Sequence, residues 1–152
     1  VIYSGLAGRP DAEADLNRQM VELSRQHMVN FNAQTPDHPD VVYRSWGGRS
    51  VNNRFNRDRA EEACSGGVHP NPDGRDVVDP LFALLHPIAR REQGANDGLV
   101  AVTSAKWGLF MGCVPADHLD EVGMMNDPAP QRFSGFNYLN LFETMAEDLS
   151  AP

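Results

Sequence analysis

The stretch ANDGLV at residues 95–100 is followed by a second one, ADHLDEV at residues 116–122, which places His118 21 residues after Asp97. Asp97 lies in a turn next to Gly98, and an apolar segment follows it. This order is typical of a carboxylate and an imidazole on neighbouring strand ends, where the carboxylate fixes the imidazole tautomer. Asp and His are also common in loops, so the spacing alone leaves open a turn former and a loop histidine.

Three further segments stand in the same order as segments of a known family: FNA at 31–33, YRSWGG at 43–48 and VDPL at 78–81. Together with the two stretches above, they resemble secreted bacterial triacylglycerol lipases of the Pseudomonas and Burkholderia type. The resemblance covers most of residues 16–150 and is densest over 79–122. It implies an α/β-hydrolase in which Asp97 and His118 are the catalytic Asp and His of a Ser–Asp–His triad.

The nucleophile of such a triad is missing from the sequence. α/β-Hydrolases carry their Ser in a G-x-S-x-G elbow, ahead of the Asp and the His. No G-x-S-x-G and no His-Gly oxyanion loop occur in the 152 residues, and Ser45 has no Gly two positions before it. The resemblance therefore implies a single domain over residues 1–152 that is the C-terminal part of a hydrolase. Its first partner would be the N-terminal half that carries the Ser.

Composition limits the classes of function. Hydrophobic residues make up 41% and charged residues 22% of the chain, which is a globular composition. A net charge of −8 argues against nucleic-acid binding. The sequence has no run of 18 apolar residues, so it predicts no membrane-spanning helix. The first residues lack the pattern of a signal peptide. Secretion, a lipid ester substrate and a dedicated foldase chaperone are implied by the resemblance alone.

Strands that alternate with helices predict an α/β fold with a mainly parallel sheet flanked by helices. We expect a helix from Asp11 to Phe31 with His27 packed on its apolar stripe, and a strand over 41–46. A short helix is expected within 54–62, and a strand or strand-to-loop segment over 99–104. The last helix should follow Ser134. Its apolar stripe consists of Tyr138, Leu141, Phe142, Met145 and Leu149.

A calcium site is a second implication of the resemblance. In the family, calcium is held by an Asp upstream of the catalytic Asp and by an Asp two residues after the catalytic His. Asp79 and Asp120 match these places, with the carbonyls of Met124 and Pro128 as further ligands. Carboxylate and carbonyl oxygens are the ligands that calcium prefers. Without a metal, Asp79 would be a turn cap and Asp120 a hydrogen-bonded loop residue.

Other functions stay open at this point. A polyester depolymerase could use the same triad, and a calcium-stabilised binding module would need no triad at all. A thiol hydrolase could use Cys113 or Cys64 as nucleophile with His118 and Asp97. The two cysteines could equally form one disulfide; the bridge of the lipase family cannot be carried over, because Thr103 stands at its second position. Asp117 and Glu121 are further carboxylates that could orient His118.

Overall fold

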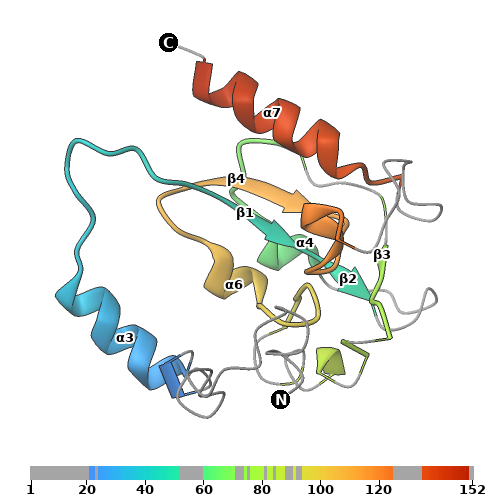
Figure 1. Ribbon diagram of the computed structural model, residues 1–152, viewed down its shortest axis with the longest axis horizontal. Helices are drawn as coiled ribbons and strands as arrows, with labels where there is room; N and C mark the ends of the chain where they lie inside the picture. Colours follow the sequence, from blue (N-terminus) through green and yellow to red (C-terminus); the bar gives the residue numbers. More distant parts are fainter. Residues whose placement is uncertain are drawn as a thin grey trace, which may run out of the picture. The chain divides into compact units, whose positions relative to one another are not determined.

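Contacts within the chain divide it into two compact units, Val1–Val41 and Val42–Pro152, where the sequence predicts one domain over residues 1–152. The computed structural model is shown in Figure 1. None of the helices it describes is long and apolar enough to cross a bilayer. The described residues are 21–22, 24–51, 60–70, 74, 76–80, 82–83, 85–87, 91, 94–124 and 135–150.

The first unit contains helix α3, Arg25–Gln34. Ser24 caps its start, since the Ser24 Oγ accepts a hydrogen bond from the His27 N–H at 3.4 Å. Thr35 ends it, because both its N–H and its hydroxyl donate to the Phe31 carbonyl. His27 and Phe31 are exposed, so the predicted packing of this stripe is not found among the described residues of the unit. The predicted beginning of the helix at Asp11 lies outside the described residues.

Parallel strand pairs form the centre of the second unit. β1, Arg44–Gly48, pairs with β4, Leu109–Val114, and β2, Ser50–Val51, pairs with β3, Asp76–Val77. The prediction of a mixed α/β fold with parallel strands is confirmed at this level. The strand expected over 41–46 starts and ends later, and it continues through two buried glycines instead of stopping at them.

Helices cover both faces of the β1–β4 pair (Figure 1). On one face, α7, Tyr138–Ser150, packs through Leu141 against Val114 and Phe136. On the other face lie α4, Ala60–Ala63, and α6, Val102–Ala105. The cluster on that face consists of Cys64, Ala95, Val102, Phe110 and Cys113. These two clusters hold the strand ends that carry the site.

Segment 99–104, predicted as a strand or a strand-to-loop segment, is a bend that leads into a short helix. The main-chain N–H groups of Leu99 and Val100 donate to the Asp97 Oδ1 at 2.8 and 2.5 Å, so they cannot join a sheet ladder. The chain then turns into the short helix α6, whose first residue, Val102, is fully buried. The hydrogen-bonding demand of one carboxylate here overrides the β propensity of the apolar run.

The C-terminal helix agrees with its prediction in place and only partly in burial. α7 begins at Tyr138, and the Asn137 Oδ1 accepts a hydrogen bond from the Leu139 N–H. Ser134, the predicted cap, lies outside the described residues. Leu141 is buried, whereas Phe142 is 45% and Leu149 71% exposed. The predicted apolar stripe therefore leaves part of its surface uncovered.

A disulfide joins Cys64, just after α4, to Cys113 in β4, with a Cα–Cα distance of 5.6 Å and a sequence separation of 49. Closing a loop of this length restricts the unfolded chain, which corresponds to about 4 kcal/mol of stability in the chain-entropy model. We expect reduction to lower the free energy of unfolding by about that amount, which urea titration measures as a lower midpoint at unchanged slope.

The matched control is the double variant Cys64→Ala/Cys113→Ala, whose unfolding should not respond to reductant. Equal urea midpoints for the oxidised and the reduced wild-type chain would contradict a stabilising bridge.

Candidate active site

The structure brings Asp97 and His118 together. The Nδ1 of His118 donates to the Asp97 Oδ2 at 2.7 Å, and the His118 main-chain N–H donates to the Asp97 carbonyl at 2.9 Å. The Asp97 side chain is 4% exposed and the imidazole 39% exposed. A buried carboxylate thus holds a half-exposed imidazole in the tautomer that leaves Nε2 to accept a proton.

The turn around Asp97 explains why the sequence reads Asn-Asp-Gly. The Asn96 Oδ1 accepts from the Gly98 N–H at 2.8 Å, and the Asn96 Nδ2 donates to the Gly94 carbonyl. Gly98 has a φ of +99°, and a Cβ there would lie 2.7 Å from the Cβ of Phe82. Only glycine fits this combination of backbone angle and close approach. The ring of Phe82 also meets the imidazole of His118 edge to face.

The hydrogen bond to Asp97 raises the pKa of His118, and the charges of Asp97, Glu121 and Asp117 act in the same direction. Partial burial of the ring opposes them by disfavouring the imidazolium. The arrangement therefore favours a protonated imidazole more than water does. This is the electrostatic requirement for a base that must hold a proton between two steps of a reaction.

Glu121 is the third member of this cluster. One oxygen of Glu121 and ligand atoms of Asp97 and His118 all lie within 4.8 Å of one another. The Glu121 Oε1 is buried without a hydrogen-bond partner among the described residues. Burial, together with the charge of Asp97, raises the pKa of Glu121 to about 8. A Cβ at Gly48 would lie 1.8 Å from Oε1, so the glycine makes room for this carboxyl group.

A second acidic cluster lies on the other side of the same loop. Carboxylate oxygens of Asp76, Asp117 and Asp120 lie within 4.8 Å of one another, and all three residues are buried. Asp76 comes from β3, whereas Asp120 opens the 3₁₀ helix η1, Asp120–Val122. Three carboxylates at this separation repel one another strongly in a buried site unless a proton or a cation compensates them.

The hydrogen bonds of the cluster differ from residue to residue. The Asp117 Oδ1 accepts from the N–H groups of Leu119 and Asp120, and its Oδ2 accepts from the Asp79 N–H at 2.7 Å. The Asp76 Oδ2, by contrast, is buried with no hydrogen-bond partner among the described residues. Burial, followed by the charges of Asp120 and Asp117, raises the pKa of Asp76 to about 8. An unpartnered buried carboxylate oxygen beside two other carboxylates fits a hard cation such as calcium.

The predicted calcium ligands fare differently. Asp120 lies in the cluster, whereas Asp79 contributes its N–H to the Asp117 side chain and Asp76 supplies the third carboxylate. Met124 lies just beyond η1 with its N–H bonded to the Leu119 carbonyl. Pro128 lies outside the described residues. Sequence reasoning missed Asp76 altogether, although it stands only three residues before Asp79.

The thiol hydrolase alternative is wrong. Cys64 and Cys113 are bonded to each other, and the sequence contains no other cysteine. Neither sulfur can therefore act as a nucleophile toward a substrate.

Comparison with curated proteins gives a match to triacylglycerol lipase 2 of Saccharomyces cerevisiae, 29% identical over 107 residues. The match covers 69% of this chain and 26% of the yeast protein, so the chain spans about a quarter of the relative's length. No protein-family model and no solved structure matches the chain. The similarity supports a lipase-like hydrolase at a coarse level. It does not support the bacterial Pseudomonas type or a C-terminal position within a lipase.

The pKa of His118 should depend on Asp97. In Asp97→Asn we expect the pKa to fall toward the ordinary histidine value, because the raising hydrogen bond and charge are lost. The raised pKa stabilises the fold fully below the pKa of the unfolded histidine, and this contribution is lost as the pH rises through the folded value. An NMR titration of the imidazole protons measures the change.

An unchanged His118 titration in Asp97→Asn would show that the carboxylate does not govern the imidazole.

Proposed function

We propose that this chain supplies the general base and its orienting carboxylate to a serine hydrolase of lipid esters, with triacylglycerols as the leading substrate. The observation that supports this most is the 2.7 Å hydrogen bond from the His118 Nδ1 to the buried Asp97 carboxylate. The similarity to a yeast triacylglycerol lipase supports the class of reaction and of substrate. The nucleophilic Ser would come from a polypeptide segment that is not in this sequence.

In this proposal the Nε2 of His118 takes the proton of the Ser hydroxyl as its oxygen attacks the ester carbonyl. The imidazolium then gives the proton to the leaving alcohol, and the acyl group stays on the Ser oxygen. Water, deprotonated by the same Nε2, releases the acid and restores the Ser. Asp97 keeps Nδ1 as the donor nitrogen throughout and stabilises the imidazolium.

A structural calcium at Asp76, Asp117 and Asp120 belongs to the same proposal. Bound calcium would neutralise the three carboxylates and tie η1 to β3. The unpartnered Asp76 Oδ2 supports this assignment, and three carboxylates suit a hard cation. The carbonyl of Met124 stays a proposed further ligand. Secretion and dependence on a foldase chaperone are proposals that rest on resemblance alone.

Calcium should raise the melting temperature of the chain, because it binds the folded state. Asp76 has its pKa raised to about 8, so below that pH calcium must displace a proton. We therefore expect a larger calcium-induced shift at pH 8 than at pH 6. In chelator, stability should fall as the pH rises from about 4 to 8, because the folded state holds the Asp76 proton more tightly than the unfolded state does.

Asp76→Asn should lose most of the calcium response, and Asp79→Asn should keep it, since the Asp79 side chain is outside the cluster. Differential scanning calorimetry with calcium and with chelator measures both. A calcium response that survives Asp76→Asn but not Asp79→Asn would reverse the assignment of ligands.

Hydrolysis should require this dyad and a nucleophile from elsewhere. The 152-residue chain alone should not hydrolyse p-nitrophenyl esters above the buffer rate. A longer product that also contains the proposed Ser segment should hydrolyse them. In that product, His118→Ala should abolish turnover. Asp97→Asn should lower it by about 10⁴, the cost of the same change in the triad of a serine protease, because Asn holds the imidazole in the wrong tautomer.

The matched control is His38→Ala, which removes the exposed histidine beside Asp40 and should leave turnover unchanged. Full turnover in His118→Ala would sink the hydrolase proposal and favour a calcium-stabilised binding module. A polyester depolymerase is distinguished by the substrate: it would release acid from a polyester film faster than from triacylglycerol.

A further inference from the structure

Strand β1 has one edge that no other strand covers among the described residues. It pairs with β4 alone, and the other edge of β4 is already occupied. There the Val68 N–H donates to the Phe110 carbonyl at 3.2 Å, and the His69 N–H donates to the Met111 carbonyl at 2.7 Å. Within the part of the chain that the structure describes, the open edge of this sheet is therefore the outer edge of β1.

The main-chain groups on that edge follow from the pairing of β1. In a strand, the N–H and C=O groups of successive residues point to opposite edges. The Tyr43 carbonyl accepts a hydrogen bond from β4 and the Arg49 N–H donates one to β4, so the odd-numbered residues face β4. The main-chain groups of Arg44, Trp46 and Gly48 therefore face the open edge. They have no hydrogen-bond partner among the described residues.

The open edge ends beside the dyad. Ser50 faces the same edge as Gly48, and its N–H donates to the Asn96 carbonyl at 3.0 Å. The Ser50 carbonyl accepts a hydrogen bond from the His86 Nε2, also at 3.0 Å. Asn96 directly precedes Asp97, and a Cβ at Gly48 would lie 2.8 Å from the Asp97 Cβ. A chain that followed the edge toward Gly48 would therefore end against the turn that carries Asp97.

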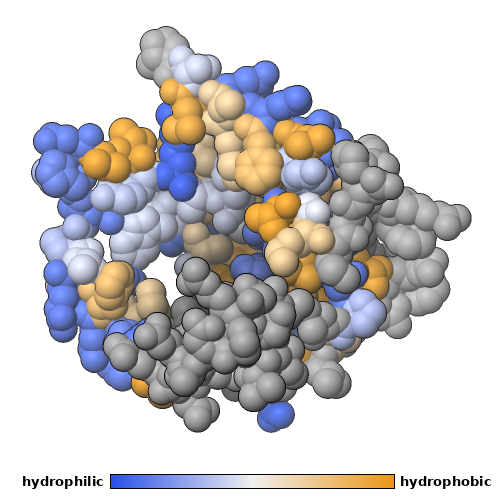
Figure 2. Space-filling view, viewed as in Figure 1, coloured by the Kyte–Doolittle hydropathy of each residue, from blue (hydrophilic) through white to orange (hydrophobic). Residues whose placement is uncertain are grey.

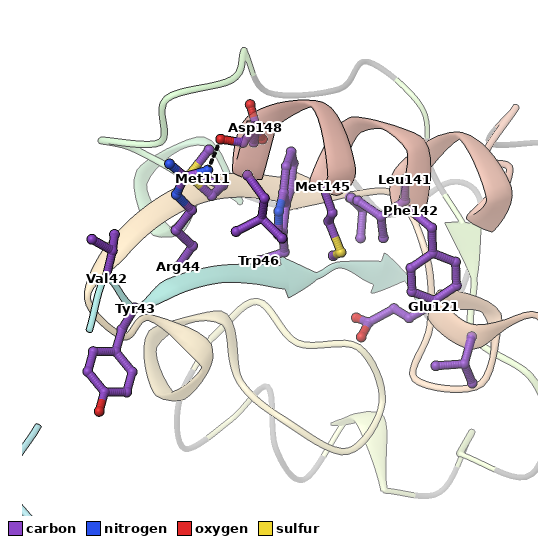
Figure 3. Close-up of a pocket in the computed structure, with 13 residues that line it drawn as sticks. Val42, Tyr43, Arg44, Trp46, Met111, Glu121, Leu141, Phe142, Met145 and Asp148 are labelled. Carbon is purple, nitrogen blue, oxygen red and sulfur yellow. Dashed lines mark hydrogen bonds between the residues drawn. The ribbon is translucent and has the colours of Figure 1, made fainter. Parts of the chain in front are cut away.

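An apolar groove runs beside this edge, between α7 and β1 (Figure 3). Its volume is about 540 Å³, and its lining includes Trp46, Phe142 and Met145. Apolar side chains gather along α7 on this face of the molecule (Figure 2). Phe142 is 45% and Leu149 71% exposed. Strands of parallel sheets are buried on both faces, so a strand added next to β1 would place alternate side chains in this groove.

We propose that the outer edge of β1 accepts a parallel β-strand from the segment that carries the nucleophilic Ser; this rests on the proposed function. Main-chain groups that repeat every second residue, about 6.6 Å apart, are matched by another extended main chain. A hydrocarbon chain would leave them without partners. In α/β-hydrolases the Ser follows the C-terminal end of a strand. Parallel pairing brings that end toward Gly48 and the dyad, whereas antiparallel pairing would carry it to Arg44.

The sequence of β1 leaves this edge unprotected. Proteins commonly block exposed edges with Lys or Pro, and β1 contains neither. Its one charged side chain, Arg44, donates to the Asp148 carbonyl on α7. A second copy of the chain is a poorer occupant than the Ser segment, because it brings no nucleophile and each copy carries a net charge of −8.

Hydrogen exchange of single amides tests the edge. In the 152-residue chain, the amides of Arg44 and Trp46 should exchange about a hundredfold faster than those of Leu109 and Arg49, which are bonded across the β1–β4 pair. In a longer product that also contains the proposed Ser segment, this ratio should fall to about one. NMR contacts between β1 and the added strand should show that the two are parallel.

Four outcomes separate the alternatives. Slow exchange of Arg44 and Trp46 in the monomeric 152-residue chain would mean that its own residues cover the edge, and slow exchange in a dimer by sedimentation would identify a second copy. Either result overturns the proposal. An antiparallel strand, or an unchanged ratio in a longer product that hydrolyses esters, overturns it and leaves the hydrolase function. A ratio of about one without hydrolysis supports the docked strand and removes the hydrolase function.

Arg44→Pro and Arg44→Ala form a matched pair of variants. Both remove the Arg side chain, and only Pro also removes the N–H that faces the open edge. In the 152-residue chain the two should have similar urea midpoints; a much lower midpoint for Arg44→Pro would show that this N–H is already bonded and would overturn the proposal. In the longer product, Arg44→Pro should turn over p-nitrophenyl esters about tenfold more slowly than Arg44→Ala. Equal turnover, with circular dichroism showing that both variants fold, would also overturn it.

Discussion

The carboxylate of Asp97 is the constraint on which the site depends. Its Oδ1 accepts the N–H groups of Leu99 and Val100, its Oδ2 accepts the Nδ1–H of His118, and its own carbonyl accepts the His118 main-chain N–H. This one residue therefore shapes the turn after it, prevents the following apolar residues from forming a strand, and orients the imidazole. Replacing it would disturb backbone and side chain together, so a loss of activity in Asp97→Asn is interpretable only beside a measurement of the His118 titration.

Much of this site follows from the sequence, and the rest does not for identifiable reasons. The pair Asp97 and His118 is predictable from the resemblance to lipases, because the spacing alone leaves a turn former and a loop histidine open, and Asp120 is indicated by the same resemblance. The place of Asp76 in the acidic cluster is not predictable, because β3 has only two residues and gives no periodicity from which to infer where its side chains lie. Glu121 was named as a carboxylate beside His118, but its burial depends on the missing Cβ of Gly48, 73 residues away in sequence.

The helices show the same division between local and distant causes. α7 is predictable because its apolar stripe repeats at helical spacing, whereas segment 99–104 has strand-forming residues and still bends into α6. The exposure of apolar residues on α7 is not predictable either. An apolar stripe indicates that a helix face is buried, but it does not indicate which element covers that face. In the second unit that face borders a groove between α7 and β1.

The stretch ADHLDEV serves two sites at once because of its local geometry. Residues 117–119 form a turn that leads into η1, with the Glu121 N–H donating to the Asp117 carbonyl, and Asp117 with Asp120 and His118 with Glu121 are pairs three residues apart along it. The first pair faces Asp76 and the second faces Asp97. Both pairs belong to one turn, in which the N–H groups of Leu119 and Asp120 donate to the Asp117 side chain. A cation that fixed Asp117 and Asp120 would therefore also restrain the backbone that carries His118 and Glu121. A cation at the acidic cluster would therefore act on His118 through the backbone, without touching the imidazole.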